Sequence, residues 1–297
     1  ILNLATVNSN LSIKDLENIS GVKAHTIRIW EKRYDLIKPE RTPTNIRFYD
    51  NTALKKLLNI SSLVSKGMKI SKAAMLSSEK LHEAIENLQK NDSVNSEKLL
   101  VNDLIIATLN CDVFSFEKYY SGYRKKHGFE ATVEKILYPL LVRIGLLWSV
   151  NKMNVGQEHF SSQLIRKKLF AAINALPHKA SDNKYLLYLP EKQHHEIGLL
   201  YAHYLILKKG NQSVYLGPNV PLSYVKSCSE TIKATHILCS FIIPIAKDKM
   251  LVYLDKMNDY FKDGQVIIHN NKKDKLDIGK RPSMSLISSI DDLKKMI

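Results

Sequence analysis

One loop of this sequence gathers residue types that bind metals. Gln193, His194, His195 and Glu196 follow an apolar run and precede Gly198. Imidazole is the commonest protein ligand for transition metals, and a nearby carboxylate or amide can orient the ring through a hydrogen bond. Paired histidines in a loop are also common as plain surface residues. This segment therefore leaves a ligand role and a surface role open.

A second group of candidate residues lies upstream in a helical stretch. Trp148 is separated by nine residues from Glu158 and His159. An indole can cover the flat face of an apolar ligand, and a carboxylate beside an imidazole can make polar contacts to it. The alternative for Trp148 is an aromatic in the core of a helical bundle.

Other kinds of chemistry find little support. The three cysteines are far apart and form no C-x-x-C pair, so neither a disulfide framework nor a zinc site is indicated. The chain contains no G-x-G-x-x-G sequence, so dinucleotide binding is not supported. No Ser/His/Asp set or pair of carboxylates stands out either, and we expect a protein that is not an enzyme.

Positive charge is concentrated near the N-terminus. The 297 residues have a net charge of +15, and residues 1–75 contain 13 lysines and arginines against 6 aspartates and glutamates. A concentrated positive field favours a polyanion such as nucleic acid. A well-solvated surface on a lysine-rich protein is the alternative.

The elements around this charge form a recognisable pattern. Residues 10–20 suit a short helix with Ser12 as N-cap, Gly21 breaks it, and residues 22–33 form a second helix with Ile27 and Trp30 on one face. Two short helices joined at a glycine predict a helix-turn-helix. Residues 41–49 then alternate basic or polar with apolar residues around a turn, which predicts a small hairpin or wing.

Residues 28–50, RIWEKRYDLIKPERTPTNIRFYD, resemble the winged helix-turn-helix of MerR-type transcription regulators. The resemblance covers about residues 3–75, and it implies that the second helix enters the major groove while the wing grips phosphates. Arg28, Arg41, Arg47 and Tyr49 would then be phosphate contacts, and Trp30 would pack in the core. The residues that would contact double-stranded DNA are His25, Thr26, Arg28, Arg33, Arg41, Asn45, Arg47 and Tyr49.

The rest of the chain divides by its periodicity. After further short helices and a linker, residues 96–178 repeat apolar positions at helical spacing, which predicts a four-helix bundle. From residue 184, strands alternate with helices, which predicts a flavodoxin-like, doubly wound parallel sheet. The expected fold is mainly α plus α/β, with segments 1–76 (winged helix-turn-helix), 77–95 (helical linker), 96–182 (bundle) and 183–297 (Rossmann-like sheet).

A bundle followed by such a sheet resembles the cobalamin-binding module of methionine synthase and of light-responsive MerR-type regulators. His195 and Gly198 match the family's His-x-x-Gly, and Trp148, Glu158 and His159 match its Trp-x9-Glu-His. The resemblance implies that cobalamin, as adenosylcobalamin, binds with His195 on the cobalt. The residues that would bind it are Trp148, Glu158, His159, Gln193, His195, Gly198 and Ser240.

Three motifs depart from that family's pattern, at four residues. Gln193 stands where a carboxylate normally orients the histidine, and Ser149 replaces the histidine that captures cobalt after light. Asn270 and Asn271 replace two glycines that let the nucleotide tail approach the backbone. We therefore expect no light response by histidine capture, and these residues leave cobalamin binding itself open.

These observations favour a cytoplasmic, DNA-binding transcription regulator whose C-terminal part controls oligomerisation. No run of heptads indicates a coiled coil, so a homo-oligomer, dimer or tetramer, would form through the bundle and sheet. No apolar run approaches the roughly 18 residues of a membrane span. The alternatives are a corrinoid carrier, a component of a corrinoid-dependent enzyme, or an interaction scaffold without ligand.

Overall fold

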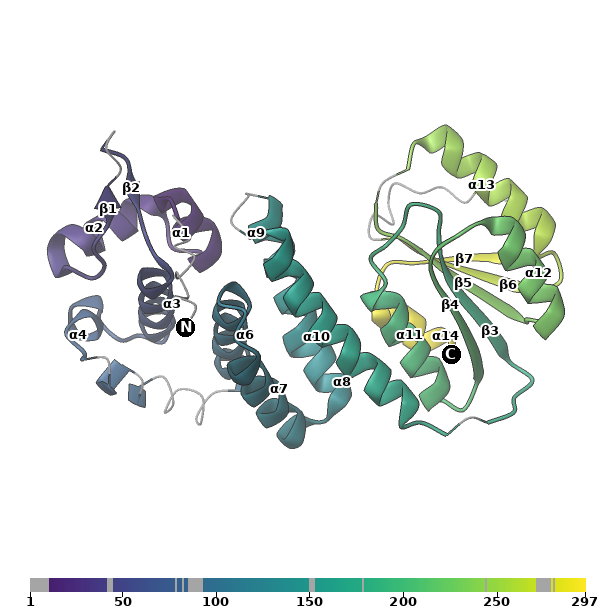
Figure 1. Cartoon of the computed structure of the whole chain (residues 1–297), viewed down its shortest axis with the longest axis horizontal. Helices are drawn as coiled ribbons and strands as arrows, with labels where there is room; N and C mark the ends of the chain where they lie inside the picture. Colours follow the sequence, from purple (N-terminus) through teal and green to yellow (C-terminus); the bar gives the residue numbers. More distant parts are fainter. Residues whose placement is uncertain are drawn as a thin grey trace, which may run out of the picture. The chain divides into compact units, whose positions relative to one another are not determined.

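The protein forms two compact units, Ile1–Ser161 and Ser162–Ile297, in a computed structural model (Figure 1). The structure describes residues 11–41, 45–77, 79–81, 83–84, 93–149, 153–177, 179–243, 245–270, 279 and 281–297. The boundary between the units falls inside a helix of the expected bundle, upstream of the expected boundary at 182/183. The second half of that helix carries Arg166, which forms an ion pair with Glu196 of the sheet unit at 2.6 Å.

The first helices of the described residues are the expected short pair, α1 (Ile13–Ser20) and α2 (Ala24–Tyr34). Ser12 caps α1 as expected, because its hydroxyl accepts from the backbone N–H of Asp15 while the Asp15 carboxylate accepts from the N–H of Ser12. Gly21 ends the helix in the left-handed region at φ 74°, a conformation that costs glycine little. The sharp turn between the two helices follows from this residue.

A two-stranded antiparallel hairpin follows, formed by β1 (Glu40–Arg41) and β2 (Arg47–Phe48). Asn45 takes the left-handed position of the turn at φ 64°, which asparagine tolerates better than most residues. Residues 42–44 of the expected wing lie outside the described part of the chain. The expected wing is therefore present, with two residues in each strand.

Two helices complete the N-terminal region, α3 (Asn51–Ser65) and α4 (Ile70–Ala74). The carboxylate of Asp50 caps α3 by accepting from the backbone N–H of Ala53 at 2.7 Å. Of the further short helices expected here, residues 79–81 and 83–84 are helical, and residues 78, 82 and 85–92 lie outside the described part of the chain.

The bundle contains the helical segments α6 (Ser93–Leu109), α7 (Val113–His127), α8 (Phe129–Thr132), the π-helical turn η1 (Val133–Leu137), α9 (Tyr138–Ser149) and α10 (Val155–Asn174). The π turn has a local cause. Pro139 has no N–H to donate, so the hydrogen-bond ladder is interrupted there. The N–H of Tyr138 donates instead to the carbonyl of Val133, five residues back.

The second unit is a parallel sheet of order β4-β3-β5-β6-β7. Its elements are β3 (Lys184–Pro190), α11 (Ile197–Lys208), β4 (Gln212–Val220), α12 (Leu222–Ile232), β5 (His236–Phe241), α13 (Lys247–Tyr260), β6 (Gln265–Asn270), β7 (Met284–Ile287) and α14 (Ile290–Met296). This is the strand order of a flavodoxin-like sheet, as expected. β4 continues past Gly217, whose φ of 85° accommodates an irregular register with β3.

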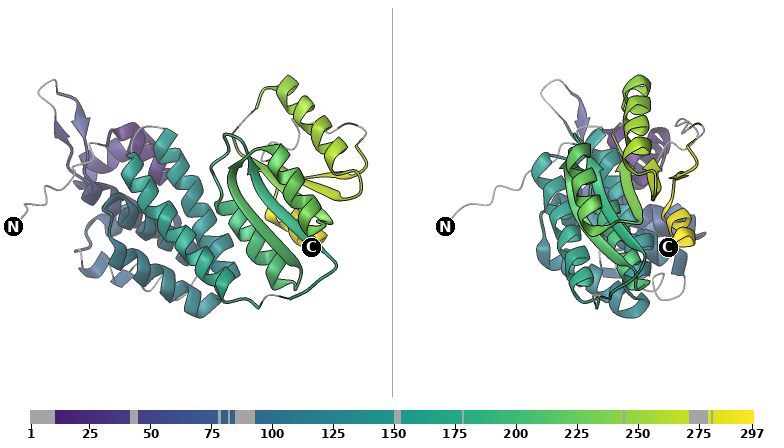
Figure 2. Two further views of the ribbon diagram at one scale, coloured as in Figure 1. Left: turned by 45° about the vertical axis from the view of Figure 1, so that its right-hand side comes forward. Right: turned by 90° about the vertical axis from the view of Figure 1, so that its right-hand side faces the viewer.

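The sheet has a core on each face. Leu186 and Tyr188 of β3 pack with residues of α12 and α13, whereas Tyr185 and Leu187 pack on the other face with α11 and α14. Figure 2 shows the sheet with its helices from two further sides. Alternate residues of a strand point to opposite faces, so a strand covered on both sides is apolar throughout. Among the described residues, no helix is both long enough and apolar enough to cross a bilayer.

Candidate functional site

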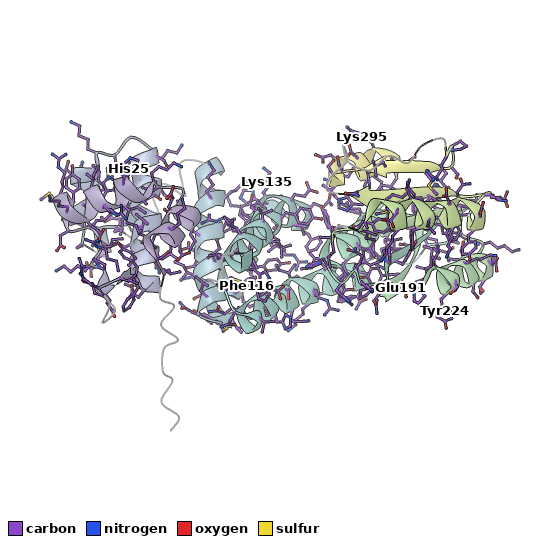
Figure 3. All side chains as sticks on the ribbon, turned by 90° about the horizontal axis from the view of Figure 1, so that it is seen from above. His25, Phe116, Lys135, Glu191, Tyr224 and Lys295 are labelled. Carbon is purple, nitrogen blue, oxygen red and sulfur yellow. The ribbon has the colours of Figure 1, made fainter. Side chains whose placement is uncertain are left out.

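The expected DNA-contacting helix, α2, presents a polar face. His25, Arg28 and Arg33 are exposed and Thr26 is partly exposed, whereas Ile27 and Trp30 are buried. Figure 3 labels His25 on this helix. The core role expected for Trp30 is confirmed by its 8% exposure. The exposed residues follow the face opposite the core, which is where a helix would meet a groove of DNA.

The wing places two cations opposite each other. Arg41 and Arg47 are register partners across the two strands, and both are exposed. Like charges directly opposite in an antiparallel pair are destabilising unless something neutralises them. Arg41 reaches the side-chain oxygen of Asn45 at 2.6 Å, which helps to hold the guanidinium over the hairpin. No described carboxylate forms an ion pair with Arg28, Arg33 or Arg47.

Tyr49 occupies a different environment from the one its expected phosphate contact requires. Its side chain is fully buried, and its backbone pairs with Leu11 in both directions. Burial, with a smaller effect of the Glu31 carboxylate, raises the pKa of Tyr49 to about 12. The hydroxyl has no hydrogen-bond partner among the described residues. Tyr49 thus joins the wing to the start of α1 from inside the core.

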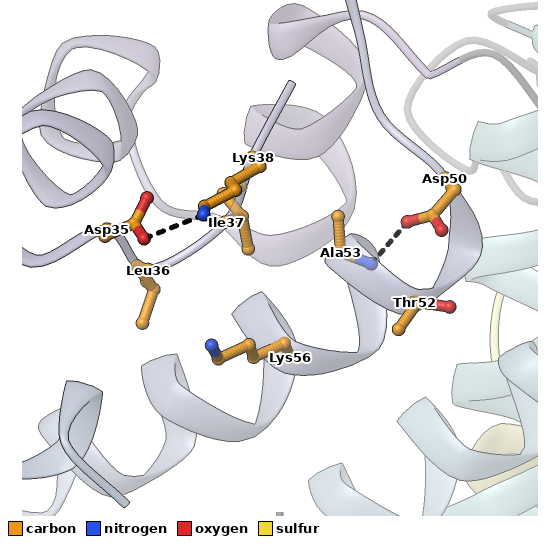
Figure 4. Close-up of a pocket in the computed structure, with 8 residues that line it drawn as sticks. All are labelled: Asp35, Leu36, Ile37, Lys38, Asp50, Thr52, Ala53 and Lys56. Atoms are coloured by element: carbon orange, nitrogen blue, oxygen red, sulfur yellow. Dashed lines mark hydrogen bonds and ion pairs between the residues drawn. The ribbon is translucent and has the colours of Figure 1, made fainter. Parts of the chain in front are cut away.

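The link between α2 and the wing packs against α3 around a shallow hollow of about 310 Å³ (Figure 4). Leu36 and Ile37 are 1% and 5% exposed, so the link is anchored by its apolar side chains. Lys38 pairs with Asp35 at 3.2 Å on the surface. The residues that line the hollow are Asp35, Leu36, Ile37, Lys38, Asp50, Thr52, Ala53 and Lys56. This packing fixes where the wing leaves α2.

In the bundle, the expected ligand residues lie at the end of α9 and in the first turn of α10. Trp148 is 49% exposed, which does not fit the alternative role as a core aromatic. The carboxylate of Glu158 lies 3.5 Å from Nε2 of His159. Both side chains are accessible, with 34% of Glu158 and 65% of His159 exposed.

A reciprocal cap fixes the start of α10. The N–H of Gln157 donates to the side-chain oxygen of Asn154, and the N–H of Asn154 donates to the side-chain oxygen of Gln157. The Gln157 amide also donates to the carbonyl of Leu109 at 2.6 Å, which ties this turn to α6. The sequence reasoning missed this cap. The Asn-x-x-Gln spacing before an apolar helix was its signal, because it resembles a capping box.

In the second unit, the loop after β3 presents His195 at the surface. The His195 side chain is exposed, and no described residue makes a hydrogen bond or ion pair with its ring. Gly198, in the first turn of α11, has no atom within 4 Å of the place where a Cβ would stand. A glycine there costs roughly 0.5–1 kcal/mol relative to alanine in a helix. Neither packing against the described residues nor a positive φ requires a glycine here, so a side chain at this position would meet open space.

Gln193 does not orient His195 in this structure. Its side-chain oxygen accepts from the N–H groups of Ile242 and Ile243 at 3.1 and 2.9 Å, and its Nε2 donates to the carbonyl of Ile243 at 2.9 Å. The side chain is 1% exposed. The amide is therefore committed to the loop after β5.

A buried ion pair, missed in the sequence, holds the residue next to His195. Glu196 receives a charge-assisted hydrogen bond from Arg166 of α10 at 2.6 Å, and its other oxygen accepts from the Tyr215 hydroxyl at 2.5 Å. Burial, then the hydrogen bond to Glu196, raises the pKa of Tyr215. The Glu196 side chain is 8% exposed. The three groups fasten the start of α11 to α10 and β4.

Ser240, the last of the expected ligand residues, is 5% exposed at the end of β5. Its hydroxyl is 2.7 Å from Nδ1 of His269 on β6. Burial lowers the pKa of His269, which favours a neutral ring that can share a hydrogen bond with the serine. Ser240 is therefore paired within the sheet.

The donor set around His195 decides what kind of metal site it could be. Among the described residues, no group of three or more His, Cys, Asp or Glu side chains could hold a metal ion. A single imidazole supplies one ligand, so His195 suits a metal whose other positions are filled by a macrocycle. The exposed imidazole and the open position at Gly198 fit such a group, whereas Gln193 and Ser240 are occupied by other partners.

Two segments of the chain match known protein families. Residues 11–80 match the family of MerR HTH family regulatory proteins, and residues 100–172 match the B12 binding domain. The chain is a MerR-type helix-turn-helix regulator that carries a B12-binding domain, and it is distantly related to the CarH and CarA repressors.

Two relatives and one solved structure show how similar the chain is to known proteins. The chain is 28% identical to the HTH-type transcriptional repressor CarH of Myxococcus xanthus, over 68% of this chain and 69% of CarH. It is 25% identical to the repressor CarA of the same organism, over 82% of this chain and 81% of CarA. The monomethylamine corrinoid protein of Methanosarcina barkeri superposes with a TM-score of 0.56 at 14% identity, covering 67% of this chain and 97% of that protein. This last likeness concerns the fold alone.

Proposed function

We propose that the protein is a non-enzymatic transcription regulator that binds double-stranded DNA through α2 and the wing, and binds a corrinoid at His195. The relatives CarH and CarA carry the name of transcriptional repressors, which supports a regulatory role. DNA binding would be carried by His25 and Thr26 near the start of α2, and by the exposed arginines beside them. Tyr49 would support the wing from the core instead of reaching phosphate.

The facing arginines of the wing carry the DNA assignment. Arg41 and Arg47 repel each other in the free protein, and phosphates of a duplex would relieve that repulsion. A structural role alone gives no reason to place two exposed guanidinium groups in register. Arg28 and Arg33 add positive charge on α2, so the contacts would extend along the backbone of the duplex.

Fluorescence anisotropy with duplex DNA tests this assignment. The probe would be a labelled duplex selected from a random pool on the full-length protein. Arg47→Ala should weaken binding about tenfold and lower the slope of log affinity against log salt by about 1, since one phosphate contact is lost. Lys125→Ala, an exposed cation on α7, is the matched control and should change neither quantity. Equal affinity and slope for Arg47→Ala and the native protein would overturn the assignment.

The corrinoid assignment rests on the surface around His195. His195 would bind cobalt, Gly198 would leave room for the ring, and Trp148, Glu158 and His159 would form the contacts from the bundle that the family resemblance implies. When bound, a corrinoid would supply a cobalt ion that can exchange ligands. The protein's own contribution is to position the exposed imidazole of His195, because the next residue, Glu196, is buried and fixed by its ion pair.

Oligomerisation would link the two sites. DNA-binding regulators of this kind read paired half-sites as dimers, so one copy of α2 and the wing needs a second. We propose that a bound corrinoid alters how copies pair through the bundle and sheet. Sedimentation of the purified protein with and without adenosylcobalamin in the dark tests this, and an unchanged mass would contradict it.

A further inference from the structure

The sheet has one natural crevice for a ligand, and a side chain crosses it. In open parallel sheets, ligands sit beyond the carboxyl ends of the strands where the strand order reverses. Here that point lies between β3 and β5, which are neighbours in the sheet but are followed by helices on opposite faces. The loops after these two strands therefore form the walls of the crevice.

Gln193 bridges those walls. Its three hydrogen bonds run from the loop after β3 to Ile242 and Ile243 in the loop after β5. The backbone of the same loop is also tied to the end of β4, because Asn219 donates its N–H to the Gln193 carbonyl and accepts from the N–H of Lys192. A group entering between β3 and β5 would have to break the Gln193 bridge.

The neighbouring strand end is also closed. The hydroxyl of Ser240 on β5 shares a hydrogen bond with Nδ1 of His269 on the neighbouring strand β6. β6 ends at Asn270, whose side chain is larger than the glycine that close backbone approach favours. By contrast, His195 and Gly198 are exposed to solvent. Among the described residues at these strand ends, the imidazole of His195 is therefore accessible, whereas the side chains of Gln193 and Ser240 are engaged by other partners.

We propose that this module binds the corrin ring through cobalt at His195 without burying a nucleotide tail between β3 and β5. The ligand class is then a corrinoid that lacks the lower nucleotide, or one whose tail stays in solvent. This inference rests on the proposed corrinoid function and specifies its ligand.

Binding of cobinamide, a corrinoid without a nucleotide, tests the proposal against binding of adenosylcobalamin. The full-length protein would be titrated with each in the dark, followed by visible absorption and calorimetry. Cobinamide should bind at least as tightly as adenosylcobalamin. Since cobinamide has no base of its own, a nitrogen splitting in the electron paramagnetic resonance spectrum of its Co(II) form must come from the protein. That splitting should be present in the native protein and absent in His195→Ala.

Variants of the bridge give a second, independent readout. Gln193→Ala removes all three hydrogen bonds, and should raise affinity for adenosylcobalamin about tenfold or more while leaving cobinamide unchanged. Gln193→Glu keeps the shape but cannot donate to the Ile243 carbonyl, so it should give a smaller change in the same direction. The matched control is Gln265→Ala. Gln265 is an exposed glutamine at the opposite end of the strands, where β6 begins.

The outcomes separate this inference from the proposed function. Adenosylcobalamin that binds tenfold or more tightly than cobinamide to the native protein, with His195 on cobalt, would overturn the inference and leave the corrinoid function standing. If neither compound binds, the corrinoid function fails and the inference fails with it. Comparable cobinamide binding with the splitting from His195 supports both.

Discussion

Replacing Arg166 by leucine removes the charge that holds the carboxylate next to His195. The Glu196 side chain is 8% exposed and that of Arg166 is 33% exposed. Leucine keeps part of the apolar stem and deletes the guanidinium, so the Glu196 carboxylate keeps only the Tyr215 hydroxyl among the partners seen in this structure. An unpaired carboxylate in that position should open the start of α11.

The geometry sets the size of the effect. Removing one partner of a fully buried ion pair costs about 3–5 kcal/mol. Because Arg166 is one-third exposed, water can reach the vacated position, and we expect about 2–3 kcal/mol. Glu196→Gln keeps the shape and the hydrogen bond to Tyr215, so it should cost about 1 kcal/mol. The double variant should lose less stability than the sum of the losses in the two single variants, and the difference should be about 1 kcal/mol or more.

Hydrogen exchange by mass spectrometry is the suitable assay. Both tryptophans, Trp30 and Trp148, lie in the first unit, so their fluorescence does not report on the sheet. Amides of α11 should exchange about 30- to 150-fold faster in Arg166→Leu, which corresponds to the expected loss of about 2–3 kcal/mol. Amides of α2 provide the internal control and should not change. Native protection of α11 in Arg166→Leu would refute the reasoning.

Three further predictions concern single side chains. Asp50→Ala removes the cap of α3 and should lower the free energy of unfolding by about 1 kcal/mol, measured by urea unfolding followed by tryptophan fluorescence. Tyr49→Phe deletes a buried hydroxyl without a described hydrogen-bond partner, so stability should stay equal or rise by up to about 1 kcal/mol and DNA affinity should not change. Weaker DNA binding by Tyr49→Phe would contradict this and would indicate that the Tyr49 hydroxyl contacts a phosphate. Burial lowers the pKa of His269 below its ordinary 6.5, so the unfolded chain binds the proton more readily and stability should fall as pH drops below about 6.5. His269→Asn should reduce that loss in urea midpoints compared at about pH 7 and pH 5.5, and an unchanged pH dependence would contradict it.

Local features of the fold could be predicted because their causes are local. Ser12 caps α1 through a residue three positions away, and Gly21 ends the helix through its own φ. The alternation of strands and helices after residue 184 likewise fixes a doubly wound sheet. The π turn before Pro139 was missed, although the proline that causes it is visible in the sequence.

The site could be predicted only in part, because its partners are distant along the chain. Gln193 was expected beside His195, but its hydrogen bonds run to residues about 50 positions away. The Arg166–Glu196 pair joins two elements that no local pattern connects. Tyr49 was expected at phosphate, yet pairing with Leu11 places it in the core. Spacing therefore named His195 and the arginines of the wing as candidates, and the structure leaves these side chains exposed. Tertiary contacts set the environments of Gln193, Glu196 and Tyr49.

The most direct test of the account is whether a corrinoid at His195 changes DNA binding by the full-length protein. Affinity for the selected duplex would be measured in the dark without corrinoid and with saturating cobinamide or adenosylcobalamin, for the native protein and for His195→Ala. We expect a change in DNA affinity of about fivefold or more in the native protein, a typical coupling between two sites, and none in His195→Ala. Identical DNA affinity with and without corrinoid, while absorption shows His195 bound to cobalt, would contradict it.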